Sequence, residues 1–563
     1  MDFDAIVVGS GMSGGWAAKE LSERGLKTLV IERGRNIDPA TDYRDGLAPW
    51  ELPNRGRLNE DEAKAKYSVG GRVGGVSYAN QQFRIIEPDH PYITPEDRPF
   101  RWVRGYHLGG RSLMWSRQTY RWSDQDFTAN ARDGHGVDWP IRYADLAPWY
   151  DHVERFAGIS GNAEGLAQLP DSQFQRGMDL NAVELDFKTK LQAAFPTRNL
   201  TIGRCAHLTE PTEEQLALGR GSCQYRDFCS RGCSYGAYFS SISATLPAAR
   251  NTGNLTIVTD AIGHSVTYDA ASGRASGVRV IDAHTKQGRE YTARIVFVCA
   301  STIGSAQVLL NSKSESFPTG IANRSDQVGR NLMDHISGMG ANGRYPGKED
   351  RYYAGRRPNG FYIPRFRNAT EPTSDFVRGY GYQGGAQRSS WDRGGGEAGV
   401  GEAFKMHLRT PGSWSVWLSG FGEMLPNPEN RVTLDESQVD QWGIPLVHIN
   451  CAYGENDLKM ARQANLDAVA MLEAAGFVDV APRGDEPFAP GAAIHEMGTV
   501  RMGRDPATSV LNGWNQAHDV SNLFVTDGAC MASTACQNPS LTYMAITARA
   551  ANHAADLIRD GAL

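Results

Sequence analysis

The stretch Val7-Val8-Gly9-Ser10-Gly11-Met12-Ser13-Gly14-Gly15 places three glycines at the spacing Gly-x-Gly-x-x-Gly close to the start of the chain. The apolar, β-branched residues 3–8 before it predict a strand, and residues 16–24 after it predict a helix with one apolar face. In such a unit Gly9 allows a tight turn, Gly11 lets the backbone approach a pyrophosphate, and Gly14 lets the helix pack on the strand. The N–H groups at the start of the helix are free to bind phosphate groups.

A second predicted strand, residues 28–31, ends at Glu32, which is placed to accept hydrogen bonds from an adenosine ribose. A glycine turn in an ordinary strand–turn–helix unit is the alternative interpretation, because the glycine spacing alone is weak evidence. Here the strand, the helix and the acidic residue all fall in register. We therefore predict dinucleotide binding, although the motif does not distinguish FAD from NAD.

The length and composition of the chain set wide limits on its class. With 563 residues it is long enough for two or three domains. A net charge of −6, from 58 basic and 64 acidic residues, gives no indication of nucleic-acid binding, and eight cysteines do not make a disulfide scaffold. Residues 1–4 have no basic segment and no apolar run approaches the roughly 20 residues of a membrane helix. We therefore expect neither a signal peptide nor a membrane span.

The middle of the chain predicts further strands and helices. Residues 33–98 show no periodicity and are interpreted as a long surface excursion, whereas residues 139–159 predict a helix and 254–258 a strand. Residues 295–299 predict another strand, followed by a turn of small residues and a helix that ends near residue 310. This strand–turn–helix unit indicates a further strand of the nucleotide-binding sheet.

The pattern changes between about residues 338 and 488. Alternating segments predict an antiparallel sheet; they are residues 361–366, 414–418 and 431–434. A helix is predicted near residues 458–475, and its Leu466, Val469 and Leu472 form one apolar stripe, which we expect to face the core.

Six segments, spread in this order over nearly the whole chain, resemble the glucose-methanol-choline (GMC) oxidoreductases. They are the glycine turn with Glu32, Gly109-Gly110, the turn and helix at 300–310, Val328 to His335, His495 to Gly503, and Asn538-Pro539. The resemblance implies an α/β (α+β) fold. It implies a Rossmann-like FAD-binding domain built from discontinuous segments, and a substrate domain on a mostly antiparallel sheet. The implied FAD-binding domain covers residues 1–337, with an iron–sulfur insertion at about 200–240. The implied substrate-binding domain covers residues 338–490. Residues 491–563 would return to the FAD-binding domain and carry the catalytic residues.

The resemblance also identifies the dinucleotide as FAD. Val258 is expected beside the adenine, and Asp527 and Gly528, which follow a predicted strand at 523–526, at the pyrophosphate or ribityl chain. The residues expected to bind FAD are Gly9, Gly11, Ser13, Gly14, Glu32, Gly109, Gly110, Ser112, Val258, Asp527, Gly528, Asn538 and Pro539. Some family members carry a flavin-linked histidine where this chain has Met114, so we expect noncovalent FAD; His107 is the nearby histidine.

By the same resemblance His495 and Asn538 face the flavin as the catalytic pair. A lone histidine is more often structural, so this assignment depends on the resemblance. The chemistry supports it, because oxidation of an alcohol requires removal of the hydroxyl proton as hydride leaves carbon, and a near-neutral imidazole suits that task. The amide of Asn538 can orient the hydroxyl. A helix is predicted at 540–559, and its positive end, at Pro539, would stabilise negative charge on the reduced flavin.

Three of the eight cysteines, Cys223, Cys229 and Cys233, lie within eleven residues, a spacing at which thiolates can converge on one metal centre. Three buried free thiols, or a zinc site that lacks one ligand, are the alternatives. The spacing is similar to that of bacterial membrane-associated sugar dehydrogenases in this family, which implies a 3Fe-4S iron–sulfur cluster. Cys205 is a weaker candidate for a fourth ligand. The other cysteines, Cys299, Cys451, Cys530 and Cys536, are interpreted as packing residues.

A cluster supplies a one-electron route away from the flavin, which favours a dehydrogenase over an oxidase. Segments 359–366, 380–387 and 417–423 supply aromatics, amides such as Gln383 and Gln387, and one carboxylate, the mixture expected for a sugar. They resemble glucoside 3-dehydrogenases, so we predict oxidation of a pyranoside at C3. The alternatives are C1 oxidation of glucose, a sugar oxidase that produces hydrogen peroxide, and a non-catalytic electron-transfer flavoprotein.

The resemblance further implies a small companion subunit and a cytochrome or other electron acceptor. Because we expect no signal peptide in this chain, the companion subunit would carry the export signal and take the folded complex to the periplasm. The cytoplasm is the alternative location.

Overall fold

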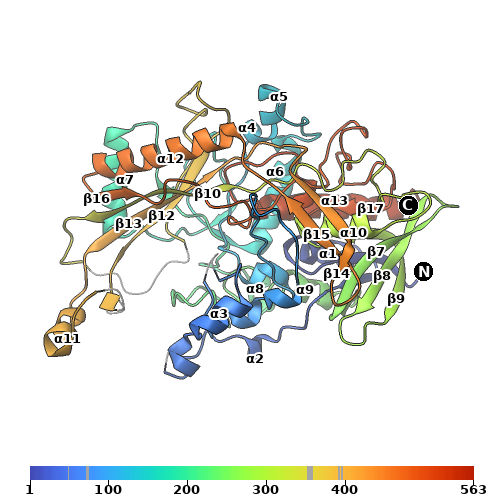
Figure 1. The fold of residues 1–563 in the computed structure, drawn as a ribbon, viewed down its shortest axis with the longest axis horizontal. Helices are drawn as coiled ribbons and strands as arrows, with labels where there is room; N and C mark the ends of the chain where they lie inside the picture. The colour runs from blue at the N-terminus through green and yellow to red at the C-terminus, as the bar shows by residue number, and fades with distance from the viewer. Residues whose placement is uncertain (49, 72–74, 352–358, 391–392, 395–396) are drawn as a thin grey trace.

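The computed structural model describes residues 1–48, 50–71, 75–351, 359–390, 393–394 and 397–563. Two large sheets organise this part of the chain (Figure 1). The seven-stranded sheet has the order β6-β2-β1-β9-β8-β7, with β17 also paired to β9, and the six-stranded sheet has the order β16-β10-β13-β12-β11-β5. The fold is therefore a mixed α/β fold, as predicted.

The seven-stranded sheet is built around β1 (Phe3–Val8), which pairs in parallel with β2 (Thr28–Ile31) and β9 (Gly288–Val298). Parallel pairing also joins β6 (Leu255–Val258) to β2 and β17 (Leu523–Val525) to β9. Helices α1 (Met12–Glu23) and α13 (Ser540–Arg559) pack against each other. These elements confirm the predicted strands and the final helix, because short apolar runs covered by helices form buried parallel strands.

The same sheet has an antiparallel extension that the sequence analysis missed. Strands β7 (Ala261–Asp269) and β8 (Arg274–Asp282) form a hairpin, and β8 pairs with the first half of β9. The second half of β9 pairs with β17 instead. Strand β9 is consequently longer than predicted, since it joins the hairpin to the parallel strands.

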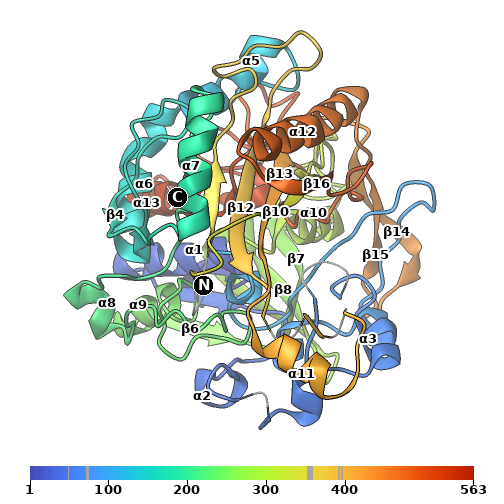
Figure 2. The same cartoon turned by 90° about the vertical axis from the view of Figure 1, so that its left-hand side faces the viewer.

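The six-stranded sheet is antiparallel throughout. Its strands are β16 (Val478–Pro482), β10 (Ile336–Tyr345), β13 (Trp414–Gly422), β12 (Tyr380–Arg388), β11 (Phe361–Ile363) and β5 (Thr201–Ile202). Helix α12 (Glu455–Ala474) crosses one face of this sheet over β10, beside α7 (Ala182–Ala194) (Figure 2). Gln383 of β12 and Trp417 of β13 line a cavity.

Two predictions for this region are wrong. Residues 431–434 begin β14 (Arg431–Val439), which pairs with β15 (Pro445–Asn450) in a separate two-stranded sheet beside α10 (Thr302–Asn311). Leu466 of α12 is 63% exposed, so it does not belong to the core stripe. Small residues, Ala461, Ala464 and Ala468, lie buried between α12 and the sheet instead, because they let helix and strands approach closely.

Shorter elements complete the described residues. The helices are α2 (Pro39–Asp42), α3 (Glu60–Lys66), α4 (Asp124–Phe127), α5 (Ala129–Asp133), α6 (Tyr143–Ala157), α8 (Glu213–Ala217), α9 (Thr245–Asn251) and α11 (Gly401–Arg409), and the strands are β3 (Ile159–Ser160) and β4 (Phe174–Gln175). Among the helices of this part of the chain, none combines the length and the apolar character that crossing a bilayer requires.

Candidate active site

A cavity of about 710 Å³ lies between the two sheets. Its lining includes Val8, Ile31 and Cys299, which end or directly follow the central strands β1, β2 and β9. From the six-stranded sheet it includes Gln383 and Trp417, together with Gly360, which directly precedes β11. The volume is that of a ligand or cofactor site, and the carboxyl ends of parallel strands are where α/β folds bind nucleotides.

The three glycines of the turn have two different roles: two allow close packing of the backbone, and one opens onto the cavity. Gly9 has φ +98°, and a Cβ there would collide with the carbonyl oxygen of Cys299. A Cβ on Gly14 would collide with the carbonyl oxygen of Gly9, whereas a Cβ on Gly11 would meet no atom within 4 Å. Packing therefore requires Gly9 and Gly14. Gly11 opens onto the cavity at the N-terminus of α1, which no side chain caps.

Glu32 connects this turn to the second glycine segment. Its buried carboxylate accepts hydrogen bonds from the backbone N–H of Gly34 at 2.9 Å and from the N–H and hydroxyl of Ser10. The Ser10 hydroxyl in turn accepts a hydrogen bond from the N–H of Gly109 at 2.8 Å. Burial raises the pKa of Glu32. The carboxylate also lines the cavity, where a ribose could reach it.

Most of the residues predicted to bind FAD line this one cavity: Gly9, Gly11, Ser13, Glu32, Gly110, Ser112, Asp527, Gly528, Asn538 and Pro539. Gly14, Gly109 and Val258 are not among the lining residues. Val258 lies on β6, where its carbonyl accepts the N–H of Glu32 at 2.8 Å. Ile262 and Gly263 of the unpredicted strand β7 line the cavity.

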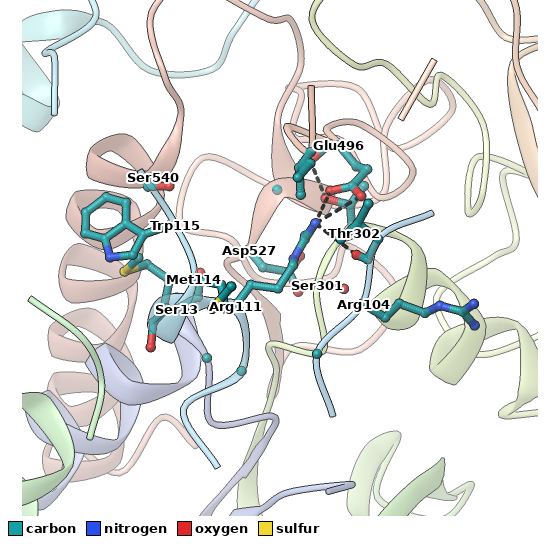
Figure 3. A pocket seen from close by; sticks show the side chains of 18 of the residues that line it. Ser13, Arg104, Arg111, Met114, Trp115, Ser301, Thr302, Glu496, Asp527 and Ser540 are labelled. Carbon is teal, nitrogen blue, oxygen red and sulfur yellow. Dashed lines mark hydrogen bonds and ion pairs between the residues drawn. The ribbon is translucent and has the colours of Figure 1, made fainter. Parts of the chain in front are cut away.

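Arg111 and Glu496 form an ion pair at the cavity, with 2.8 Å between Nη1 and Oε2 (Figure 3). The backbone carbonyl of Glu496 also accepts the hydroxyl of Thr302. This pair was not predicted, because its partners are 385 residues apart and neither side chain has a chemical signal that points to the other. Met114 lines the cavity, whereas His107 is buried outside the lining.

The imidazole of His495 is held on both sides. Its Nε2 lies 3.1 Å from Nδ2 of Asn538, and its Nδ1 lies 2.9 Å from Nδ1 of His335. Its backbone N–H donates to the Asp334 carboxylate at 2.9 Å. Desolvation, followed by the charges of His335 and Arg111, holds the pKa of His495 well below its usual value of 6.5. The ring is therefore neutral at physiological pH and can accept a proton.

Asn538 is oriented from the six-stranded sheet. The side-chain amide of Gln383 donates to Asn538 Oδ1 at 2.7 Å. Asn538 and Pro539 directly precede α13, so the positive end of this helix faces the cavity. The structure thus brings both predicted catalytic residues together at the cavity. It places Gln383, which was expected near the substrate, against Asn538, and it places His335 against His495, a contact that the sequence did not predict.

Two side chains expected near the substrate lie elsewhere. Gln387 is exposed at the end of β12. Glu423 is fully buried and pairs with Arg365 and Arg378, and Arg365 also approaches Asp126 at 3.2 Å. The expectation that this carboxylate serves the substrate is wrong, because two arginines already neutralise it. Asn359, Gln383 and Trp417 line the cavity on that side.

The three clustered cysteines, Cys223, Cys229 and Cys233, line a second, small cavity together with His207. Sγ of Cys229 lies 3.7 Å from Nε2 of His207, and Cys229 also lines the large cavity. Burial raises the pKa of Cys223 to about 11, and the two neighbouring thiols add to this effect. Within the described ranges, no group of three or more His, Cys, Asp or Glu side chains is placed to hold a metal ion.

The other five cysteines are buried and do not line the small cavity. Cys205 contacts the hydroxyl of Ser160.

Comparison with known proteins matches two segments of the sequence, residues 3–337 and 426–547, to the GMC oxidoreductases. The chain is 28% identical to 2-methyl-1,2-propanediol dehydrogenase of Mycolicibacterium austroafricanum, over 98% of this chain and 94% of that protein. It is 26% identical to the fructose dehydrogenase large subunit of Gluconobacter japonicus, over 99% and 98% of the two chains. A shorter match, 35% identical over 23% of this chain and 25% of the other, is to C-glycoside 3-oxidase of Microbacterium trichothecenolyticum. Among solved structures, pyridoxine 4-oxidase from Mesorbium loti has the same fold, with a TM-score of 0.60 at 17% identity over 98% of both chains.

Proposed function

Because the chain belongs to the GMC oxidoreductase family, we propose that it is an FAD-dependent dehydrogenase that oxidises a hydroxyl group of a sugar or glycoside to a carbonyl. The observation that carries this proposal is the position of His495, whose ring contacts His335 and Asn538 at the cavity that residues 9–13 of the glycine turn also line. A hydride acceptor bound at such a turn would lie in the same cavity as the base that removes the hydroxyl proton.

The cavity lining includes residues suited to each part of FAD: the adenosine, the pyrophosphate and the flavin. Glu32 would bind the adenosine ribose, and the N-terminus of α1 at Gly11 would bind the pyrophosphate. The flavin would lie toward Gly110, His495 and Asn538. When bound, FAD accepts the hydride that leaves the substrate carbon. Binding is proposed to be noncovalent, which is supported by Met114 in the lining and by the position of His107 outside it.

In this proposal His495 and Asn538 share the substrate hydroxyl. The hydroxyl proton passes to Nε2 of His495, while the side-chain N–H of Asn538 donates to the hydroxyl oxygen. The positive end of α13 stabilises the negative charge that develops on the cofactor. His495, Asn538 and Pro539 all line the cavity, which supports these roles.

A sugar fits the substrate side of the cavity. Asn359 and Gln383 supply amides, and Trp417 supplies a flat apolar surface on the face of β13 opposite to the buried Val416 and Leu418. A sugar ring has apolar faces and a rim of hydroxyls, and a site that pairs each hydroxyl discriminates strongly. The match to a fructose dehydrogenase subunit over 99% of this chain supports a sugar substrate. We propose oxidation of a pyranoside at C3, supported by the shorter match to a C-glycoside 3-oxidase. C1 oxidation of glucose is the alternative.

Methyl glucoside tests the position of oxidation, because it has no free anomeric hydroxyl. We expect the holoenzyme to bleach its flavin absorbance anaerobically with methyl glucoside and to form a 3-keto product, identified by NMR. Glucose, which has a free anomeric hydroxyl, is the substrate for comparison. Rapid lactone formation from glucose together with no reaction toward any glycoside would contradict the C3 assignment.

We also propose that electrons leave through an iron–sulfur cluster, of the 3Fe-4S type, held by Cys223, Cys229 and Cys233. In support, the three thiols line one small cavity, and Cys229 lines the flavin-sized cavity as well. The loop would have to draw the thiols closer around the cluster than they are in this structure.

For the Cys229→Ser protein we expect loss of bound iron, while sugar still bleaches the flavin, because hydride transfer does not involve the cluster. Electron delivery to an external acceptor should fail first. Iron analysis and anaerobic flavin spectra measure the two effects separately, and Cys451→Ser, a buried cysteine in the core, is the matched control. Unchanged iron content in the Cys229→Ser protein would exclude this site.

A small companion subunit that carries an export signal, a cytochrome or other electron acceptor, and a periplasmic location complete the proposal. The name of the fructose dehydrogenase relative, a large subunit, supports the existence of a companion. Export of this chain when it is expressed alone would contradict the companion's role.

A further inference from the structure

Four side chains form one row of hydrogen bonds, from Gln383 on β12 to His335, which directly precedes β10. Gln383 contacts Asn538, Asn538 contacts His495, and His495 contacts His335, at 2.7, 3.1 and 2.9 Å. Gln383, Asn538 and His335 are at most 8% exposed. The row therefore replaces water as the hydrogen-bonding environment of the His495 ring.

The direction of the first bond fixes the directions of the others. The amide N–H of Gln383 donates to Asn538 Oδ1, so Asn538 presents its NH₂ group to His495. An NH₂ group only donates, so Nε2 of His495 must accept and carry no proton. The ring proton is then on Nδ1, and it is donated to Nδ1 of His335.

The surroundings hold the two ends of the row in place. Gln383 lies in the middle of β12, whose backbone pairs with β11 on one side and β13 on the other. His335 is fully buried, and the neighbouring Asp334 carboxylate accepts the backbone N–H groups of Gly491, Ala493 and His495. Phe421 packs against His495, with 5.7 Å between ring centroids. The imidazole thus has little freedom to turn over.

We propose that Gln383 and His335 are positioning residues that fix the tautomer of His495, so that its unprotonated Nε2 always faces the cavity. This inference rests on the proposed role of His495 as the base. Reversal of the Asn538 amide would place its NH₂ against the NH₂ of Gln383 and put the proton on Nε2 of His495. The unprotonated nitrogen would then face His335, where no substrate hydroxyl reaches it.

Nitrogen-15 NMR of the holoenzyme, labelled only at histidine, tests the inference without substrate. The His495 signals are identified by their loss in the His495→Ala protein. We expect a pyridine-type shift at Nε2 and a pyrrole-type shift at Nδ1. A protonated Nε2 in the unaltered enzyme would overturn the proposal by itself.

Three variants separate positioning from packing. Gln383→Leu and His335→Leu should give a mixture of both tautomers and slow flavin reduction roughly five- to tenfold, the scale of one lost orienting hydrogen bond. His335→Asn, whose Oδ1 can accept at the place of Nδ1, should restore a single tautomer and most of the rate. Unchanged tautomers in both leucine variants would overturn the proposal.

Failure of the proposed function would look different. No sugar or glycoside would bleach the flavin of the unaltered enzyme, while the NMR signals of His495 would still report its tautomer.

Discussion

The His495→Ala protein is expected to retain FAD but to reduce it about 100- to 10,000-fold more slowly with substrate, the usual scale for a positioned acid–base group. Alanine cannot accept the hydroxyl proton, and water cannot replace the imidazole with the same geometry between Asn538 and His335. Retention of FAD follows because Gly9, Gly11 and Glu32, which would bind its other end, are unchanged.

Anaerobic stopped-flow spectra measure this effect directly, because they follow flavin reduction and not electron transfer to an acceptor. His407→Ala is a suitable control, since His407 is an exposed histidine on α11. A reduction rate in the His495→Ala protein within a few-fold of the control would exclude His495 as the base.

The second large effect is expected on stability, from Arg365→Leu. Arg365 is fully buried and is placed between the carboxylates of Glu423 and Asp126, which are fully buried as well. Without Arg365, the Glu423 carboxylate keeps only Arg378 as a charged partner, at 3.6 Å. The Asp126 carboxylate loses the positive charge that lies 3.2 Å away. Removal of one member of a buried ion pair destabilises by about 3–5 kcal/mol.

Urea unfolding followed by fluorescence measures this change. Arg344→Leu is the matched control, because Arg344 pairs with Asp479 on the surface, at 47% and 70% side-chain exposure, and such pairs contribute only about 0–1 kcal/mol. Equal stabilities of the two variants would contradict the role given to the buried cluster.

The parts of the fold that could be predicted are those whose own short stretch of sequence determines the element. Strands β1 and β2 and helix α13 begin and end where the sequence analysis placed them, because each combines an apolar run with a glycine or proline boundary. The hairpin β7–β8 was missed, since its half-exposed strands have weak alternation. Leu466 was misplaced because three apolar residues suggested a stripe, whereas alanines form the packed face of α12.

The candidate site shows the same limit. His495 and Asn538 came from recognisable segments, and the structure places their side chains in contact. Gln383 and the carboxylate of Glu423 were expected near the substrate, but the sequence could not identify their partners. A carboxylate or amide on a strand gives the same sequence pattern whether it contacts substrate, an arginine or another amide. Only the structure shows that Arg365 pairs with one and Asn538 with the other.

Strand β17 and the start of α13 have a consequence for biosynthesis. Strand β17 and the cavity residues between 527 and 543 are synthesised only after β9 and all strands of the six-stranded sheet. Until then, residues 296–298 of β9 can pair with β1 on one side, but their other side lacks its partner β17 and can pair with other chains. We expect the nascent chain to need chaperone protection until β17 has been made, and to bind its cofactor only after residues 527–543 have folded.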